Sequence, residues 1–316
     1  MNKKEFDVLV VGELNVDLIL NNLESFPETG KEKLAGQMTL TLGSSSAIFA
    51  CNLSALGAKV AFLGKVGTDS FGDMVIDELK NKGVDVSMII RDKELKTGAS
   101  IILNFNEDRA MITHPGAMNE LSFKDISSDK LNRAKHLHFS SFYLQPGLKD
   151  NAGDMFKLAK ENGLTTSFDM QWDPAEKWDM DYKKILPHVD VFLPNEQEIL
   201  FLTKQTDLNK ALEQLSGFAN NIIVKLGSKG SLSWDTKKTH LLNAFLNTDV
   251  VDAIGAGDSF NAGFIFKYLQ NRDIEECQVF GNLLGALNTT ASGGTGAFMN
   301  YEQIINTAKE KFRFKD

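Results

Sequence analysis

Short runs of apolar residues recur along the chain, and each is followed by a glycine or a polar turn. Residues 6–11 (FDVLVV) form the first run, and similar runs lie at 134–139, 165–168, 190–193 and 221–226. A continuous apolar run of this kind is typical of a strand buried on both faces of a parallel sheet. Segments with apolar residues at helical spacing separate these runs. The alternation predicts an α/β fold, a doubly wound, mostly parallel sheet flanked by helices.

Two segments break this alternation and predict a second, smaller sheet. Residues 17–42 contain two strand-like runs separated by a polar stretch with Pro and Gly, and residues 98–114 contain a hairpin pattern around Asn106-Glu107-Asp108. A small sheet inserted beside the main one can close over a pocket as a lid. We therefore expect one domain over residues 1–316, with lid strands from these two segments.

The composition narrows the class of function. Of the 316 residues, 42% are hydrophobic, and the net charge of −8 argues against non-specific binding to nucleic acid or to an anionic membrane. Cys51 and Cys277 both lie in apolar helical patterns, as expected for buried thiols in a reducing compartment. No apolar run is long enough to span a membrane, and the first residues lack the pattern of a signal peptide. We expect a cytoplasmic protein without nucleic-acid or membrane partners.

Polar side chains follow several predicted strands directly. Asn15 and Asp17 come after the first strand and are two residues apart, so they share one face if the chain stays extended. Ser140 and Gln145 follow a second strand end. The polar turn at residues 169–174 follows a third strand. Open α/β sheets bind ligands at the carboxyl ends of their strands, so these side chains are expected to line one pocket mouth. The alternative is that they only satisfy the backbone of local turns.

Residues 250–263 (VVDAIGAGDSFNAG) carry the strongest local signal. Gly255 and Gly257 let the backbone turn sharply and approach a ligand, just before an amphipathic helix. The first turn of a helix has unpaired N–H groups and the positive end of the dipole, so it can hold an anion. Asp258 would repel a phosphate there unless it takes a proton from the group that attacks that phosphate. The alternative is that Asp258 only caps the helix.

The segment Asp252-Ala-Ile-Gly-Ala-Gly-Asp258, with Asn261-Ala-Gly263, resembles the C-terminal signature of the ribokinase-like (PfkB) carbohydrate kinases. The resemblance extends from about residue 6 to residue 298 in matching motif order. It implies a ribokinase-like fold with a β-sheet lid, and ATP and Mg²⁺ as cosubstrate and cofactor. It also implies that Asp258 removes the proton of the sugar hydroxyl, while the backbone N–H groups of Ala256, Gly257 and Asp258, in the turn that begins at Gly255, hold the developing charge.

The resemblance also implies a set of sugar-binding residues. The family carries Asn-x-Asp at Asn15 and Asp17, where it contacts sugar hydroxyls. Its ribokinase form, Gly-Gly-Lys-Gly-Ala-Asn, begins at Gly43, so Ile48 replaces the sugar-binding Asn and ribose is disfavoured. The further candidates are Ser44 and Ser45 at the start of the following helix, with an N-cap as the alternative role, and Arg109 in the lid, with a solvated position as its alternative.

On the nucleotide side, Asn195 and Glu198 match the family's Asn-x-x-Glu, in which the Glu acts on Mg²⁺ through water and the Asn lies near the phosphates. Acidic residues in the first turn of a helix are also ordinary partners of its dipole. Residues 225–230 match the family's nucleotide site, which implies nucleotide contacts for Lys225, Gly227, Ser228 and Gly230, together with Gly257. Asp252 and Ile254 correspond to the position where some relatives hold a potassium ion.

Our primary hypothesis is an ATP-dependent sugar kinase that acts on a hexose such as fructose, with dimerisation through the lid as a further expectation. A 2-keto-3-deoxygluconate kinase is the alternative, which requires a cation from Arg109, Lys31 or Lys33 for the carboxylate of its substrate. A non-catalytic sugar or nucleotide sensor on the same scaffold is a third hypothesis. A dinucleotide-dependent oxidoreductase is disfavoured because the first strand lacks the glycine fingerprint.

Overall fold

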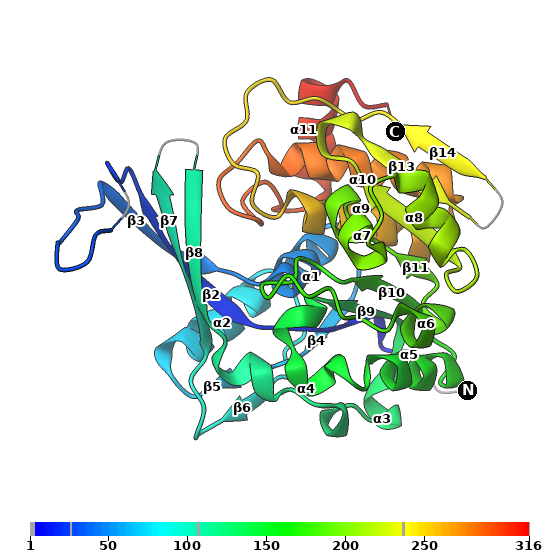
Figure 1. The fold of residues 1–316 in the computed structure, drawn as a ribbon, viewed down its shortest axis with the longest axis horizontal. Helices are drawn as coiled ribbons and strands as arrows, with labels where there is room; N and C mark the ends of the chain where they lie inside the picture. Colours follow the sequence, from blue (N-terminus) through cyan, green and yellow to red (C-terminus); the bar gives the residue numbers. More distant parts are fainter. Residues whose placement is uncertain (1–3, 26, 106–107, 236–237, 316) are drawn as a thin grey trace.

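The computed structural model describes residues 4–25, 27–105, 108–235 and 238–315, of which the side chains at 108 and 109 are not described. Eight strands form the main sheet in the order β14-β13-β12-β11-β10-β9-β1-β4 (Figure 1). Within this sheet, β12, β11, β10, β9, β1 and β4 are parallel to one another, whereas β13 is antiparallel to both of its neighbours, β12 and β14. Their bounds are β1 (Phe6–Val11), β4 (Val60–Leu63), β9 (Ala134–Ser140), β10 (Thr165–Asp169), β11 (Val191–Phe192), β12 (Asn221–Lys225), β13 (Ser231–Trp234) and β14 (Thr239–Leu242).

Helices cover both faces of this sheet. Along β1, Val8 and Val10 belong to one buried core and Leu9 and Val11 to the other, because successive side chains of a strand point to opposite faces. The chain is therefore doubly wound, as the apolar runs predict. The helices are α1 (Ser45–Ala55), α2 (Ser70–Asn81), α3 (Ser128–Leu131), α4 (Pro146–Lys149), α5 (Ala152–Glu161), α6 (Tyr182–Ile185), α7 (Glu196–Thr203), α8 (Leu208–Leu215), α9 (Ala256–Leu269), α10 (Ile274–Asn288) and α11 (Tyr301–Phe312).

A four-stranded lid sheet stands out from the body beside α1 and α2 (Figure 1). Its order is β3 (Gln37–Leu42), β2 (Asn15–Asn21), β7 (Gly98–Phe105) and β8 (Asp108–His114). The predicted lid is confirmed, with the parallel pairing of β2 and β7 joining its two sequence regions. The turn of the predicted hairpin at residues 106–107 lies outside the described residues. The first lid strand begins at Asn15 rather than residue 17, so the Asn-x-Asp pair lies within the lid sheet.

A third, two-stranded sheet was not predicted. It pairs β5 (Lys65–Gly67) with β6 (Ile90–Asp92) in parallel. The sequence of the glycine-rich segment after β4 predicts a turn. The segment forms strand β5 because it pairs with the distant strand β6. Within the part of the chain that the structure describes, no helix is long and apolar enough to cross a membrane.

Candidate active site

The N-terminus of α9 forms a tight mouth that only glycine permits. Gly255 precedes the helix with φ = 77°, and a Cβ at this position would lie 2.7 Å from the Cα of Gly294. Among the described residues, the N–H groups of Gly257 and Asp258 have no protein acceptor, whereas that of Ala256 donates to Ala253 at 3.3 Å. Two free N–H groups at the positive end of a 14-residue helix therefore face outward for an anion.

Asp258 lies buried in the first turn of α9. Its side chain is 7% exposed, and Gln171 Nε2 donates to its Oδ1 at 2.9 Å. Burial, and then the nearby Asp169 carboxylate, raises the pKa of Asp258 to about 8. Lys225 and the hydrogen bond from Gln171 act in the opposite direction. A carboxyl group with this pKa exchanges a proton readily near neutral pH, as a general base must.

A polar cluster lies behind Asp258, and sequence reasoning did not bring it together, although it expected residues 169–174 at the pocket mouth and Lys225 in the nucleotide site. Asp169 is fully buried at the end of β10, and its Oδ2 accepts hydrogen bonds from Lys225 Nζ at 2.5 Å, from Asn261 Nδ2 at 2.6 Å and from Gln171 Nε2 at 3.2 Å. The polar turn after β10 and the Asn of the signature segment are visible in the sequence. Their meeting around Asp169 depends on the sheet order.

Lys225 keeps its charge inside this cluster. Its burial lowers the pKa of the ammonium, but the attraction of Asp169 and Glu198 outweighs that effect and the pKa is raised. The ammonium lies 3.8 Å from the position that a Cβ of Gly257 would occupy, so its charge reaches the mouth of α9. Lys225 can therefore attract a phosphate to that mouth.

The predicted sugar-binding pair lies together on β2. Asn15 Nδ2 donates to Asp17 Oδ1 at 2.9 Å and to Ser100 Oγ of β7 at 3.3 Å. A Cβ on Gly43 would lie 2.3 Å from Asp17 Oδ1 and 2.5 Å from Asn15 Nδ2, so this position must be glycine. Burial raises the pKa of Asp17 to about 6, against the hydrogen bond from Asn15.

The serines after Gly43 serve the backbone more than an open pocket. Ser44 has φ = 71°, where the ribokinase form has glycine, and its Oγ donates to the carbonyl of Glu13 at 2.6 Å and accepts from Ala47 N at 2.9 Å. Ser44 is therefore the N-cap of α1, the alternative role named above. Ser45 is half-buried at the first position of that helix.

Glu13 was not predicted as a site residue. Its carboxylate accepts hydrogen bonds from the backbone N–H of Ser46 at 3.1 Å and from the Ser46 hydroxyl, which in turn lies 2.7 Å from Ser140 Oγ. Burial raises the pKa of Glu13, and its charge acts on both Asp17 and Asp258. Glu13 thus joins the segment before β2 to the first residues of α1.

Ile48, at the position where the ribokinase form has Asn, is buried in this structure. Its side chain is 4% exposed and lies against Gly255 and Gly294. A Cβ on Gly294 would lie 2.4 Å from Ile48 Cδ1. Ile48 therefore supports the mouth of α9 by packing and offers no hydrogen bond to a sugar.

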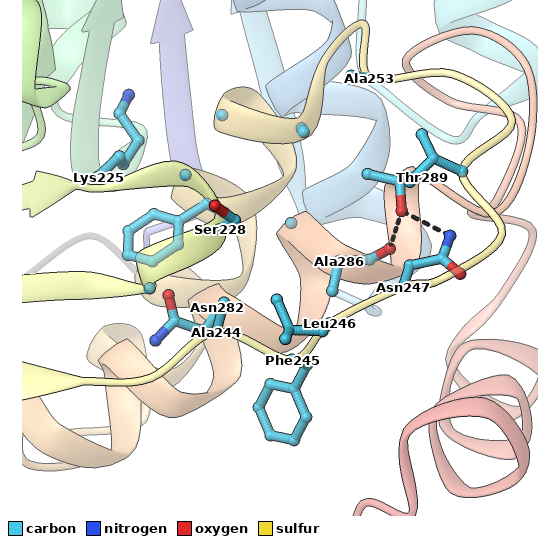
Figure 2. A pocket seen from close by; sticks show the side chains of 17 residues that line it. Lys225, Ser228, Ala244, Phe245, Leu246, Asn247, Ala253, Asn282, Ala286 and Thr289 are labelled. Carbon is cyan, nitrogen blue, oxygen red and sulfur yellow. Dashed lines mark hydrogen bonds between the residues drawn. The ribbon is translucent and has the colours of Figure 1, made fainter.

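A cavity of about 320 Å³ opens beside the mouth of α9 (Figure 2). It brings together five predicted nucleotide-binding residues: Lys225, Gly227, Ser228, Gly230 and Gly257. The other walls are mostly apolar, from Ala244, Leu246, Val250 and Ala286, with Asn282 and Thr289 as polar groups. A mostly apolar cavity with a few polar groups is typical of a small-molecule site, and a planar heterocycle fits such walls.

Asn195 and Glu198 lie next to the Lys225 cluster and do not line this cavity. They form a capping box on α7, in which Asn195 Oδ1 accepts from Glu198 N at 2.9 Å and Glu198 Oε2 accepts from Asn195 N at 2.8 Å. Burial, and then Asp169, raises the pKa of Glu198 to about 7. Glu198 supplies a carboxylate, an oxygen ligand that suits Mg²⁺ held through water, and the neighbouring Asp169 adds negative charge, so the residues present fit the implied metal.

Asp252 and Ile254 connect the loop before α9 to the end of α10 and to the loop that follows α10. Asp252 Oδ1 accepts from Ile254 N at 2.9 Å, and its Oδ2 accepts from Gly293 N at 2.9 Å. The carbonyl of Ile254 accepts from Asn288 Nδ2 at 2.7 Å. The oxygens that correspond to the potassium position of some relatives therefore already have protein donors.

The structure describes the side chains of the lid lysines Lys31 and Lys33 but not that of Arg109. Lys31 and Lys33 both form ion pairs with Glu28, at 2.6 and 3.1 Å. The backbone of Arg109 pairs with Asn104 in β8 and β7, and its side chain lies outside the described residues.

Comparison with known proteins identifies the class. Residues 5–299 match the family model described as pfkB family carbohydrate kinase. The protein is a carbohydrate kinase, a phosphotransferase with an alcohol group as acceptor. The chain belongs to the pfkB family.

Two curated relatives illustrate the range of the family. An uncharacterized sugar kinase of Archaeoglobus fulgidus is 35% identical over 236 residues, which cover 74% of this chain and 92% of the relative. A 5-dehydro-2-deoxygluconokinase of Clostridium tetani is 26% identical, over 98% of this chain and 94% of the relative.

Two solved structures share the fold. Ribokinase from Thermotoga maritima is 26% identical, with a TM-score of 0.83 over 96% of this chain and 99% of its own. A putative ribokinase II from E. coli in complex with ATP and Mg²⁺ is 22% identical, with a TM-score of 0.81 over 96% and 99% of the two chains.

Proposed function

We propose that the protein transfers the γ-phosphate of ATP to a hydroxyl of a small carbohydrate, with Asp258 as the general base. The observation that carries this proposal is the position of Asp258 between two sets of residues. On one side, α1 follows Gly43, which packs against Asn15 and Asp17, and Ile48 of α1 packs against Gly255 at the start of α9. On the other side, Lys225 leads to the cavity beside α9.

Each side chain has a definite part in the proposed reaction. Asn15 and Asp17 hold hydroxyls of the acceptor, and Asp258 accepts the proton of the hydroxyl that attacks the γ-phosphate. The N–H groups of Gly257 and Asp258 and the Lys225 ammonium stabilise the charge on the transferring phosphoryl group. The base and ribose of ATP occupy the cavity beside α9. Mg²⁺, held through water by Glu198, would neutralise charge on the phosphates.

We infer a neutral hexose, such as fructose, as the acceptor. Ile48 contributes no hydrogen bond at the position where the ribokinase form has Asn, which disfavours ribose. Lys31 and Lys33 lie beside Glu28, whose negative charge offsets part of theirs, so the lid lysines offer little net positive charge to an acidic sugar.

A keto-deoxy sugar acid, such as 2-keto-3-deoxygluconate, is the second candidate. The curated relative named 5-dehydro-2-deoxygluconokinase favours this class. Its carboxylate would require a cation, and Arg109 in β8 is the candidate that the lid offers.

A substrate screen tests these proposals. Purified protein is incubated with ATP, Mg²⁺ and a panel of hexoses, pentoses, nucleosides and keto-deoxy acids, and the ADP formed is measured. The hexose proposal predicts the highest kcat/KM for a neutral six-carbon sugar, and Arg109→Met should leave that value unchanged. A preference for a sugar acid, lost in Arg109→Met, would favour the second candidate. Sugar binding without ADP formation would favour a non-catalytic sensor.

We also propose a homodimer through the lid. Leu40, Leu18, Ile101 and Ile112 are paired in register across the four strands and therefore share one face of the sheet. Ile112 is 66% exposed, and Leu40 and Ile101 are each about 40% exposed. A second copy could cover this apolar face. Light scattering should give a dimer that Ile112→Glu converts to a monomer, and a monomeric parent protein would refute the proposal.

A further inference from the structure

Three buried polar side chains from three helices meet behind the mouth of α9. Asn52 lies on α1, Ser259 on α9 and Asn288 at the end of α10, and all three are fully buried. Asn52 Nδ2 donates to Ser259 Oγ at 2.9 Å, and Ser259 Oγ lies 2.9 Å from Asn288 Oδ1. We call Asn52, Ser259 and Asn288 the buried triad.

The triad holds backbone carbonyls of the two loops that form the mouth. Asn288 Nδ2 donates to the carbonyl of Ile254 at 2.7 Å, and Ser259 Oγ lies 2.8 Å from the carbonyl of Gly255. Asn52 Nδ2 also donates to the carbonyl of Gly294 in the second loop, at 2.9 Å. One amide group of α1 therefore contacts both α9 and the loop that packs against Gly255.

The position of these carbonyls determines where the anion site points. Each peptide unit is planar, so a rotation that moves the carbonyl of Ile254 or Gly255 also moves the N–H group of the next residue. The N–H groups of Gly257 and Asp258 follow within the same helical turn. Because Gly255 and Gly294 are in direct contact, a shift of one loop is transmitted to the other.

We propose that the buried triad consists of positioning residues that hold the anion site in the geometry needed for phosphoryl transfer. The proposal rests on the proposed kinase function of Asp258 and its N–H groups. Asn52 has a special place in it, because α1 also carries Ser46, which contacts Glu13 on the acceptor side. The triad thus couples the acceptor side of the site to the phosphate side through one helix.

Asn52→Leu keeps the size of the side chain and removes its hydrogen bonds. We expect kcat to fall by about 10- to 100-fold, because misplacing reacting groups by 1 Å can cost about 100-fold. The KM values for the sugar and for ATP should change by less than about threefold, since an interaction needed only in the transition state affects kcat. A purely structural role would lower the melting temperature and leave kcat unchanged.

Gln278→Leu is the matched control. Gln278 is also a fully buried amide on α10, and its Nε2 donates to the carbonyls of Ser231 and His240, away from the triad. We expect Gln278→Leu to lower the melting temperature to a similar degree with an unchanged kcat. An equal loss of kcat in both variants would overturn the proposal, as would a folded Asn52→Leu with wild-type kcat.

Ser259→Ala keeps the proposal testable if Asn52→Leu does not fold. It removes one hydroxyl from the triad, and its loss of kcat should not add to that of Asn288→Ala, because both changes break one network. Fully additive losses would refute the triad as a unit. A wild-type protein that forms no ADP with any acceptor would instead refute the proposed function as well.

Discussion

Lys225 and Asp169, 56 residues apart in the sequence, form a buried ion pair with 2.5 Å between Nζ and Oδ2. Lys225 lines the cavity beside α9, and Gln171 Nε2 donates to the carboxyl groups of both Asp169 and Asp258. It places a positive charge at the proposed phosphate site while Asp169 raises the pKa of the proposed base. One ion pair therefore serves both the nucleotide side and the acceptor side.

Replacing Lys225 should cost both stability and nucleotide binding. Lys225→Met leaves Asp169 buried without its partner, so we expect a loss of about 3–5 kcal/mol in the free energy of unfolding. Asp169→Asn in the same chain should recover much of this loss without restoring ATP binding. Urea unfolding and calorimetric ATP titration measure the two effects.

Lys135→Met is the control for that substitution. Lys135 pairs with Asp7 on the surface, where its side chain is 60% exposed, so its removal should change stability by about 1 kcal/mol or less. Equal losses for Lys225→Met and Lys135→Met would argue against a buried, essential pair.

Asp258→Asn should abolish most of the activity and leave ATP binding intact. Loss of a positioned general base commonly reduces the rate by about 100- to 10,000-fold. The variant keeps the shape of the side chain, so the fold and the cavity should be preserved. A coupled ADP assay and ATP titration provide the measurement. A folded variant that phosphorylates sugar at the wild-type rate would end the assignment of Asp258 as the base.

The stability of the ligand-free protein should fall as the pH rises from about 6.5 to 8, above the range in which the buried His136 and His138, whose pKa values are lowered, act in the opposite direction. Burial raises the pKa values of Asp17, Glu198 and Asp258 to about 6, 7 and 8. In this range the folded state holds more protons at these groups than the unfolded state does, so the free energy of unfolding decreases with pH. Urea unfolding at several pH values should show a shallower decrease in Asp258→Asn. An identical slope in both proteins would contradict the raised pKa of Asp258.

Gly43→Ala should impair binding of the acceptor selectively. The new methyl group would collide with Asn15 and Asp17, and we expect at least about a tenfold increase in the KM for the sugar, which is equivalent to about 1.4 kcal/mol of binding energy. The KM for ATP should stay unchanged. Gly217→Ala is the control, because a Cβ there meets no atom within 4 Å. If Gly43→Ala leaves the KM for the sugar unaltered, Asn15 and Asp17 do not belong to the acceptor site.

Activity should be independent of potassium. The resemblance to other family members points to a cation near Asp252 and Ile254, but their oxygens already accept hydrogen bonds from Gly293, Asn288 and the loop itself. We expect less than a twofold change in kcat when choline chloride replaces potassium chloride at constant ionic strength. A tenfold loss of kcat in the absence of potassium would indicate that a cation binds near Asp252 and Ile254.

The local sequence determined most of the elements, apart from the short β5–β6 sheet, and predicted the chemical type of the site. Continuous apolar runs marked the parallel strands, and the turn at Gly255 and Gly257 marked the mouth of α9, because a special backbone geometry leaves its trace in the residue type. The same local signals left the role of Ser44 open between two alternatives. Ser44 fits either a sugar contact or an N-cap, and its backbone at φ = 71° with two hydrogen bonds decided for the cap.

Only the tertiary structure decided which distant side chains meet. Asp169 and Lys225 come from strands separated by β11, and Asn52 reaches Ser259 across 207 residues. Nothing in the residues around Glu13, Asp169 or Asn52 reveals these partners, because a hydrogen bond between distant segments depends on strand order and helix packing. The sequence by itself therefore predicted a phosphate-binding turn and a base, and the fold decided which charges surround them.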